Sequence, residues 1–358
     1  MESNNVLFTI VVPMYNVQNF LSECLDSIAN QTLKNFKVLL IDDGSTDKTK
    51  DIAKKYVKKY PALFSYQYQE NKGLGGARNT GIALAKSKYC LFLDSDDFLS
   101  TTTIEHLTQA IIDNYEPDIV ITAPTIYNSA TQTYSPFFDN ERLEWLFKDK
   151  AVTNVEETPG LLALEASFWR CIWRTEFLKE SNFPFLEHVS WEDVPPHFVL
   201  FHRAKRIMRY SYFPTFFYRI NTGNQITAST GKNRLDVPVV FNQVITTMHK
   251  EKWKDEDVAH VIKMLATFVS WSISVIDDSY REEFVSKVHK LYRTLTKRDY
   301  RAYKQYIKPS FKERLIYKTY RSNHLHKVLF DRSKTVILEK RYNTFKKIVK
   351  KVIRKGSK

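Results

Sequence analysis

Residues 89–97 read YCLFLDSDD, a short apolar run that ends in the carboxylates Asp94, Asp96 and Asp97. The run is typical of a buried strand, and the acidic residues follow at its carboxyl end. Carboxylates gathered at such a point repel one another unless a cation neutralises them. The pattern therefore indicates a hard divalent ion whose shell is completed by substrate phosphates. The alternative is a loop in which Asp97 only caps the next helix.

Apolar runs and stretches of helical period alternate on both sides of this strand. We predict strands at 8–12, 36–41, 64–68 and 89–93, separated by helices at 20–28, 46–60 and 74–86. Such spacing predicts an α/β fold, with a Rossmann-like, mostly parallel nucleotide-binding sheet flanked by helices. Helices near 104–112 and 161–170 and strands at 119–123, 207–210 and 216–220 follow, and the pattern beyond 236 is helical.

Sheets of this kind bind ligands outside the carboxyl ends of their strands. Polar clusters follow the first two predicted strands, at 13–16 (PMYN) and 42–45 (DDGS). An acidic side chain after the second strand could accept a hydrogen bond from a ribose hydroxyl or a base N–H. The alternative is a simple turn, because Asp-Gly is a turn dipeptide.

The segment 71–79, NKGLGGARN, is rich in glycine and opens a predicted helix, which suits phosphate binding. It is not a dinucleotide fingerprint, because Arg78 stands where the third glycine is required, and it is not a P-loop.

Two adjacent carboxylates, Glu192 and Asp193, precede a further predicted helix. One interpretation is a general base that the positive helix end keeps ionised. The other is acidic capping of the helix, which stabilises by about 0.5–2 kcal/mol.

The ordered set VVPMYN, LLIDDGSTD, NKGLGGARNTGIALA, CLFLDSDD and WED resembles the family 2 glycosyltransferases of the GT-A fold, of the bacterial cell-surface polysaccharide or teichoic acid type. The resemblance covers roughly residues 7–225. It implies inverting transfer of a sugar from a nucleotide diphosphate donor, usually a UDP-sugar, with Mn²⁺ or Mg²⁺ as cofactor.

The resemblance also implies roles for individual residues. Nucleotide-sugar contacts would come from Pro13, Tyr15, Asn16, Asp42, Asp43, Gly75, Arg78, Asp94 and Ser95. Asp96 would ligate the metal, Asp193 would deprotonate the acceptor hydroxyl, and Glu192 would orient that base. Arg219 and Gln225 would belong to a loop that closes over the donor, with Gln225 in place of the commoner serine.

The acceptor expected from the resemblance is a glycan, a polyol-phosphate polymer or a lipid-linked molecule, as in teichoic acid, capsule or exopolysaccharide synthesis. The chain lacks the Gln-x-x-Arg-Trp box of processive members, and we expect no charge-free apolar stretch of 18 residues or more. The N-terminus does not read as a signal peptide, and three dispersed cysteines suit a reducing compartment. We therefore expect a cytoplasmic protein, peripheral at the inner face of the cell membrane.

Charge is distributed unevenly along the chain. The net charge is +14, but residues 301–358 hold 19 Lys+Arg and 3 Asp+Glu, a net of +16, so the other 300 residues have a net of −2. A nucleic-acid binder would carry the excess on its body, and we therefore exclude that class. Residues 339–355 (EKRYNTFKKIVKKVIRK) form a basic amphipathic pattern, which favours an anionic membrane surface or a polyanionic acceptor; the alternative is a helix packed on its own core.

Four regions are expected: a nucleotide-sugar-binding half (1–105), an acceptor-binding half (106–235), a helical region (236–330) and a basic tail (331–358). The helical region could pack on the catalytic part or on another subunit, which leaves a homo-oligomer open. The competing functional class is a non-catalytic scaffold that retains the fold and uses its tail for recruitment. The clustered carboxylates favour the enzyme, because a scaffold has no physical reason to keep them.

Overall fold

The computed structural model describes residues 6–114, 116–148, 150–211, 213–221, 229–323, 327 and 329. The chain divides into two units, Met1–Thr227 and Ala228–Lys358. This division falls shortly before residue 235, where we expected the catalytic part to end. The predicted basic tail, 331–358, lies outside the described residues.

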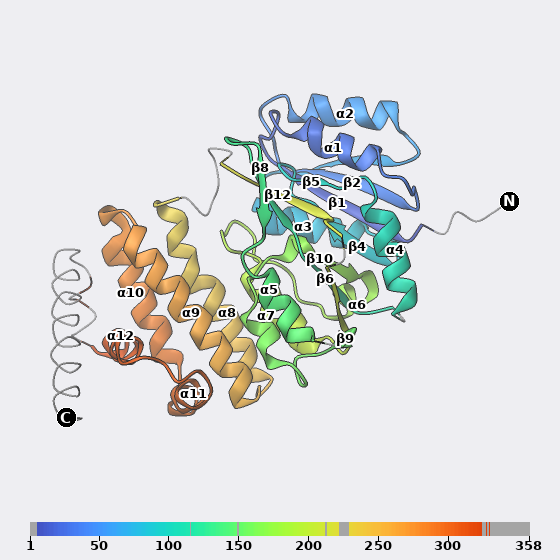
Figure 1. The fold of residues 1–358 in the computed structure, drawn as a ribbon. Helices are drawn as coiled ribbons and strands as arrows, with labels where there is room; N and C mark the ends of the chain where they lie inside the picture. The colour runs from blue at the N-terminus through green and yellow to red at the C-terminus, as the bar shows by residue number, and fades with distance from the viewer. Residues whose placement is uncertain are drawn as a thin grey trace. The chain divides into compact units, whose positions relative to one another are not determined.

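Within its described residues, the first unit contains an eight-stranded mixed sheet (Figure 1). Its spatial order is β3 (Phe64–Tyr68), β2 (Phe36–Asp42), β1 (Phe8–Met14), β4 (Tyr89–Phe92), β10 (Cys171–Arg174), β6 (Ile119–Thr122), β11 (Ile207–Tyr210) and β9 (Val152–Thr153). The pairs from β3 to β4 are parallel, as is β6 with β11, whereas β10 and β9 run antiparallel to their neighbours. The predicted α/β class is confirmed, and the antiparallel strands β10 and β9 are additions to it.

Helices cover both faces of this sheet because its strands are apolar on both sides. Helices α1 (Leu21–Ala29), α2 (Thr49–Lys59) and α4 (Thr103–Asp113) pack with the side chains of Ile10 and Val12 in one core. The opposite face carries α3 (Gly73–Leu84), α6 (Thr175–Glu180) and α7 (Val194–Arg203). Gly81 of α3 lies directly over Val11, where an added Cβ would be 2.4 Å from a Val11 methyl carbon.

A second sheet of short strands extends the first unit and was not predicted. Among the described residues it has the order β5 (Phe98–Leu99), β12 (Phe216–Ile220), β7 (Thr125–Asn128) and β8 (Thr133–Pro136). Phe98 and Phe217 stack at 4.8 Å between ring centroids. Because β5 begins directly after Asp97, this sheet holds the far end of the acidic segment found in the sequence.

The predicted helix at 161–170 is wrong. The chain instead makes two 3₁₀ turns, η1 (Pro159–Ala163) and η2 (Phe168–Arg170), after helix α5 (Asn140–Phe147). Asp139 explains the difference, because it accepts the Glu165 backbone N–H at 2.8 Å and binds both Nη atoms of the Arg170 guanidinium at 2.6 and 3.0 Å. These bonds fix the backbone in a non-helical course.

The second unit is helical, as predicted. Its elements are η4 (Lys232–Asp236), α8 (Val237–Lys250), α9 (Asp255–Val275), α10 (Asp278–Thr294), α11 (Lys297–Ala302), the π-helical turn η5 (Tyr303–Ile307) and α12 (Phe311–Arg321). Among the described residues, one helix, α9, is long and apolar enough to cross a membrane, judged by its length and composition alone. We expected no charge-free apolar stretch of 18 residues or more. Helix α9 is not charge-free, because it contains Lys263. Since core helices of soluble proteins pass the same test, this is weak evidence for a span.

Candidate active site

The polar clusters predicted from the sequence lie at one edge of the large sheet. β1 pairs with β2 so that Met14 lies opposite Asp42. On its other side β1 pairs with β4, and the Leu93 N–H donates to the Val11 carbonyl oxygen at 3.0 Å. The segments after β1, β2 and β4 therefore leave the same edge, including the acidic loop of residues 94–97.

Asn16 joins the loops that follow β1 and β2. Its backbone has φ of 53°, a left-handed conformation in which asparagine is enriched. Its Oδ1 accepts the Thr46 N–H at 2.8 Å, and its own N–H donates to Ser45 Oγ at 3.2 Å. The neighbouring Tyr15 has 52% of its surface exposed, so its ring is available at this edge.

Asp42 and Asp43 are buried and bonded to protein groups. Asp42 accepts the Ser45 N–H at 2.9 Å and the Tyr66 hydroxyl at 2.5 Å. Asp43 accepts the Lys72 N–H at 2.8 Å, which ties the end of β2 to the start of α3. Both carboxylates therefore order the loops at the edge of the sheet.

The buried Arg78 guanidinium connects two parts of the site that are far apart in sequence. Its Nη2 donates to Asp94 Oδ1 at 3.1 Å and its Nη1 to Glu192 Oε1 at 2.6 Å. Arg78 is 1% exposed, with the rings of Phe168 and Phe185 each 5.7 Å from its central carbon. Charge-assisted bonds of this kind are about twice as strong as neutral ones. We call this Asp94–Arg78–Glu192 contact the arginine bridge.

Helix α3 also holds the backbone that leads to Glu192. Asn79 exchanges two hydrogen bonds with the backbone of Phe185, at 2.9 and 3.0 Å, and the His188 N–H donates to the Lys72 carbonyl oxygen at 2.9 Å. Gly75 permits this approach, because a Cβ on it would lie 2.2 Å from the carbonyl oxygen of residue 186. The structure thus gives the glycine-rich segment a packing function.

Asp193 precedes helix α7 but does not cap it with its side chain. Burial, followed by the negative charge of Glu192, raises the pKa of Asp193 well above its ordinary value. Two residues earlier, Trp191 is buried with φ of 65°, an uncommon conformation for a bulky residue. Such local strain is typical of functional segments.

Sequence reasoning missed Glu165, which we placed inside the wrongly predicted helix. Its charge adds to those that raise the Asp193 pKa, after burial and Glu192. Burial and the charge of Asp139 also raise the pKa of Glu165 itself. A lone acidic residue in the apolar run LLALEASFW is the signal that could have identified it.

Asp96 has the chemistry expected of a ligand for a hard cation. Burial, together with the charge of Asp94, raises its pKa to about 6, so a cation would relieve the cost of ionising it. No group of three or more His, Cys, Asp or Glu side chains converges as a metal site anywhere in the described residues.

The structure describes only one of the two residues that were predicted for a loop closing over the donor. Gln225 lies outside the described residues. Arg219 is buried on β12 and binds the acidic loop. Its Nε donates to the Asp96 carbonyl oxygen, and its backbone N–H donates to the Asp97 carboxylate.

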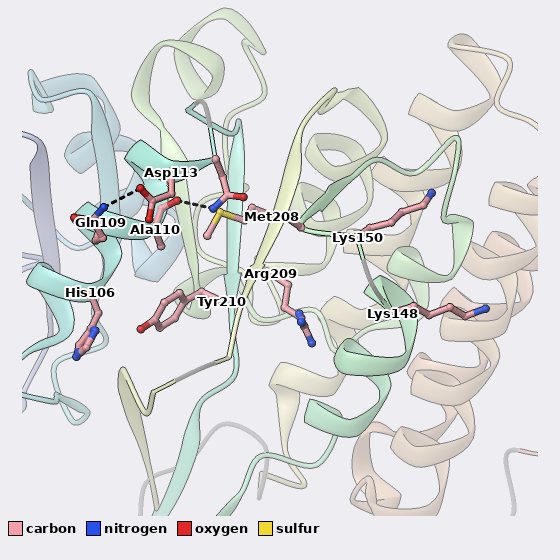
Figure 2. A pocket seen from close by; sticks show the side chains of 11 residues that line it. His106, Gln109, Ala110, Asp113, Lys148, Lys150, Met208, Arg209 and Tyr210 are labelled. Atoms are coloured by element: carbon pink, nitrogen blue, oxygen red, sulfur yellow. Dashed lines mark hydrogen bonds between the residues drawn. The ribbon is translucent and has the colours of Figure 1, made fainter.

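A separate pocket of about 550 Å³ lies between α4 and β11, and Lys148, Lys150 and Ala151 also line it. Figure 2 shows His106, Tyr210 and Arg209 along it, with the Gln109–Asp113 hydrogen bond on its α4 side. None of the predicted site residues lines this pocket.

The first unit thus combines an α/β sheet, an acidic loop at the carboxyl edge of that sheet, a buried arginine and an aspartate ahead of a helix. Residues 9–166 match the model of glycosyl transferase family 2, and the mixed sheet flanked by helices has the predicted GT-A fold.

Two relatives and one solved structure illustrate the extent of the likeness. The uncharacterized glycosyltransferase EpsJ of Bacillus subtilis is 36% identical over 207 residues, which cover 56% of this chain and 58% of EpsJ. The minor teichoic acid biosynthesis protein GgaB of the same organism is 34% identical over 160 residues, covering 44% of this chain and 17% of GgaB. The chain thus spans less than two thirds of either relative. The crystal structure of S. aureus TarS 1–349 in complex with UDP-GlcNAc shares the fold, with a TM-score of 0.71 and 21% identity over 90% of both chains.

Gly75→Ala should destabilise the first unit by about 1–3 kcal/mol, the usual cost of overpacking, because its Cβ would collide with the backbone of residue 186. Urea unfolding measures the change. Gly231→Ala is the control, since the nearest atom to its Cβ would be Ser229 Oγ at 3.8 Å. Equal stability of the two variants would contradict the packing function of Gly75.

Proposed function

We propose that the first unit is an inverting, metal-dependent glycosyltransferase that moves a sugar from a UDP-sugar to a hydroxyl of a cell-surface polymer or a lipid-linked acceptor. The observation that carries the proposal is the arginine bridge, because it ties the acidic loop to the segment of the candidate base. The match of residues 9–166 to glycosyl transferase family 2 supports the class of reaction, and the UDP-GlcNAc complex of TarS supports the class of donor.

The donor would bind across the edge formed by β1, β2 and β4. The exposed Tyr15 ring would lie against the uracil, and Asp94, which keeps 24% of its side chain exposed, would face the ribose. Pro13, Asp42 and Asp43 are buried, and they would fix the loops that carry these contacts. Ser95 and the start of α3 near Gly75 would complete the diphosphate side.

Asp96 would hold Mn²⁺ or Mg²⁺, which supplies Lewis-acid stabilisation of the departing diphosphate. The raised Asp96 pKa supports this assignment, because it shows a carboxylate whose charge the protein alone compensates poorly. Asp94 differs from Asp96 in that Arg78 already neutralises it. The arrangement leaves Asp96 as the carboxylate of the loop that is available to a cation.

Asp193 would act as the general base. It would take the proton of the acceptor hydroxyl while the hydroxyl oxygen forms a bond to the anomeric carbon and the bond from that carbon to the diphosphate breaks on the opposite side. Glu192 is bound to Arg78 and fixes the backbone beside Asp193. A raised pKa suits this function, since a base is most effective when its pKa lies near the working pH.

The acceptor and the cellular location are inferred from relatives and charge. The teichoic acid function in the name of GgaB supports a glycan or polyol-phosphate polymer as acceptor. The basic residues of 331–358 support attachment to the anionic inner face of the cell membrane from the cytoplasm.

Asp193→Ala should lower transfer by roughly 10²–10⁴-fold while leaving UDP affinity unchanged, because only the proton acceptor is removed. Calorimetry with UDP and a radiolabelled transfer assay measure the two quantities. Transfer by the wild type should fall as the pH drops through the raised pKa of Asp193, beginning at a higher pH than for an ordinary aspartate. Asp113→Asn, on α4, is the matched control and should change neither quantity; full transfer by Asp193→Ala would exclude it as base.

Asp96→Ala should abolish the stimulation of transfer by Mn²⁺ without lowering the melting temperature, because it removes one of several like charges from the loop. Transfer with and without EDTA, together with thermal melts, checks both expectations. Undiminished stimulation by Mn²⁺ would contradict the ligand assignment.

Deletion of residues 331–358 should weaken binding to vesicles containing anionic lipid, since each basic residue near such a surface contributes about 1 kcal/mol. Sedimentation with phosphatidylglycerol and with neutral phosphatidylcholine vesicles compares the two forms. The same binding by both would favour a tail packed on the protein.

A further inference from the structure

Arg219 forms hydrogen bonds with the acidic loop and with helix α1. Its backbone N–H donates to Asp97 Oδ1 at 2.8 Å, and its Nε donates to the Asp96 carbonyl oxygen at 2.7 Å. Its Nη2 reaches Glu23 Oε2 of helix α1 at 2.7 Å. One side chain thus connects the second sheet, the acidic loop and a helix of the large sheet.

The surroundings of Arg219 restrict its guanidinium to this position. The rings of Phe20, Phe98 and Tyr127 lie 5.5, 5.2 and 5.1 Å from its central carbon, at distances typical of cation–π contacts. Arg219 is 5% exposed. A guanidinium held by three rings and by the backbone of the acidic loop is not free to close over a donor, which is the function that the sequence suggested for Arg219.

Asp97 shows why the loop needs this support. It is 1% exposed, and its Oδ2 has no hydrogen-bond partner among the described residues. A buried carboxylate with one oxygen unbonded is costly unless a cation lies nearby. Arg219 supplies both the N–H that Asp97 accepts and a positive charge beside it.

We infer that Arg219 is a positioning residue for metal binding: it fixes the backbone of Asp96 so that the Asp96 side chain is presented to the cation at the donor edge. The inference rests on the proposed function, since it assumes that Asp96 ligates the metal. Partners that orient metal ligands commonly contribute 10–100-fold to metal affinity.

The test measures Mn²⁺ binding to the full chain saturated with UDP. The electron paramagnetic resonance signal of free Mn²⁺ reports how much of the ion remains unbound. Arg219→Met keeps a side chain of similar length among the three rings but removes the guanidinium. It should raise the dissociation constant for Mn²⁺ by about 10–100-fold, while UDP affinity in EDTA stays within about twofold of wild type. Unchanged Mn²⁺ affinity in this variant would overturn the inference.

Glu23→Gln is the milder variant, because Glu23 is 55% exposed and its loss should not affect folding. Removing this partly exposed ion pair should weaken Mn²⁺ binding roughly 1.5- to 5-fold. If Arg219→Met does not fold, this variant decides, and Mn²⁺ affinity equal to that of wild type would count against the inference.

Arg174→Met is the matched control. Arg174 binds Asp118 through two nitrogen atoms at 2.7 and 3.1 Å, and Asp118 lies just before β6, at the opposite edge of the sheet from the acidic loop. Arg174→Met should bind Mn²⁺ as tightly as wild type does. If it weakened Mn²⁺ binding as much as Arg219→Met does, the effect of Arg219→Met would be general destabilisation, and the inference would be overturned. If the wild-type UDP complex takes up no Mn²⁺, the metal in the proposed function is contradicted first, and the inference fails with it.

Discussion

The bonds of the Arg78 guanidinium to Asp94 and Glu192 are the contact on which the site depends. The two carboxylates are 98 residues apart in the sequence, and the Arg78 guanidinium joins the acidic loop to the WED segment through them. Removing one partner from a buried ion pair typically costs 3–5 kcal/mol, because the remaining charge is left uncompensated. Stability and geometry of the site are therefore coupled at Arg78.

Two arginines with different supports neutralise the acidic loop. The Arg78 side chain, on α3, binds the Asp94 carboxylate. The Arg219 side chain, on β12, donates to the Asp96 carbonyl oxygen, and the Arg219 backbone N–H donates to the Asp97 carboxylate. Both are buried and lie beside aromatic rings. Burial and the charge of Asp94 still raise the pKa of Asp96, so the protein compensates this carboxylate only in part. A cation and a diphosphate would complete this balance of charge.

The sequence predicted the large sheet well where strand, helix and turn signals agree. Strand 64–68 was placed at its observed bounds, and the edge that gathers Asp42 and Asp94 follows from parallel pairing alone. The second sheet was missed because its strands are short and pair over long separations, as β12 does with β5. The error at 161–170 has a tertiary cause, since Asp139 fixes that backbone from outside the segment.

Side-chain partnerships could not be predicted from pattern. Arg78 was expected to contact the nucleotide-sugar, and nothing in the spacing of the motifs indicates that both its Nη atoms bind carboxylates of the protein. Gly75 was expected near phosphate, and its close approach to residue 186 depends on a segment about 110 positions later. Such contacts are decided by packing between distant segments, which a single sequence does not encode locally.

The most direct test of the account is the release of UDP from a panel of UDP-sugars by the wild-type chain, with Mn²⁺ and with EDTA, in the presence of candidate polymer acceptors. The account predicts release from one donor, dependent on Mn²⁺ and faster with the acceptor. No release from any donor, together with no UDP binding by calorimetry, would contradict it and favour a protein that retains the fold without the activity.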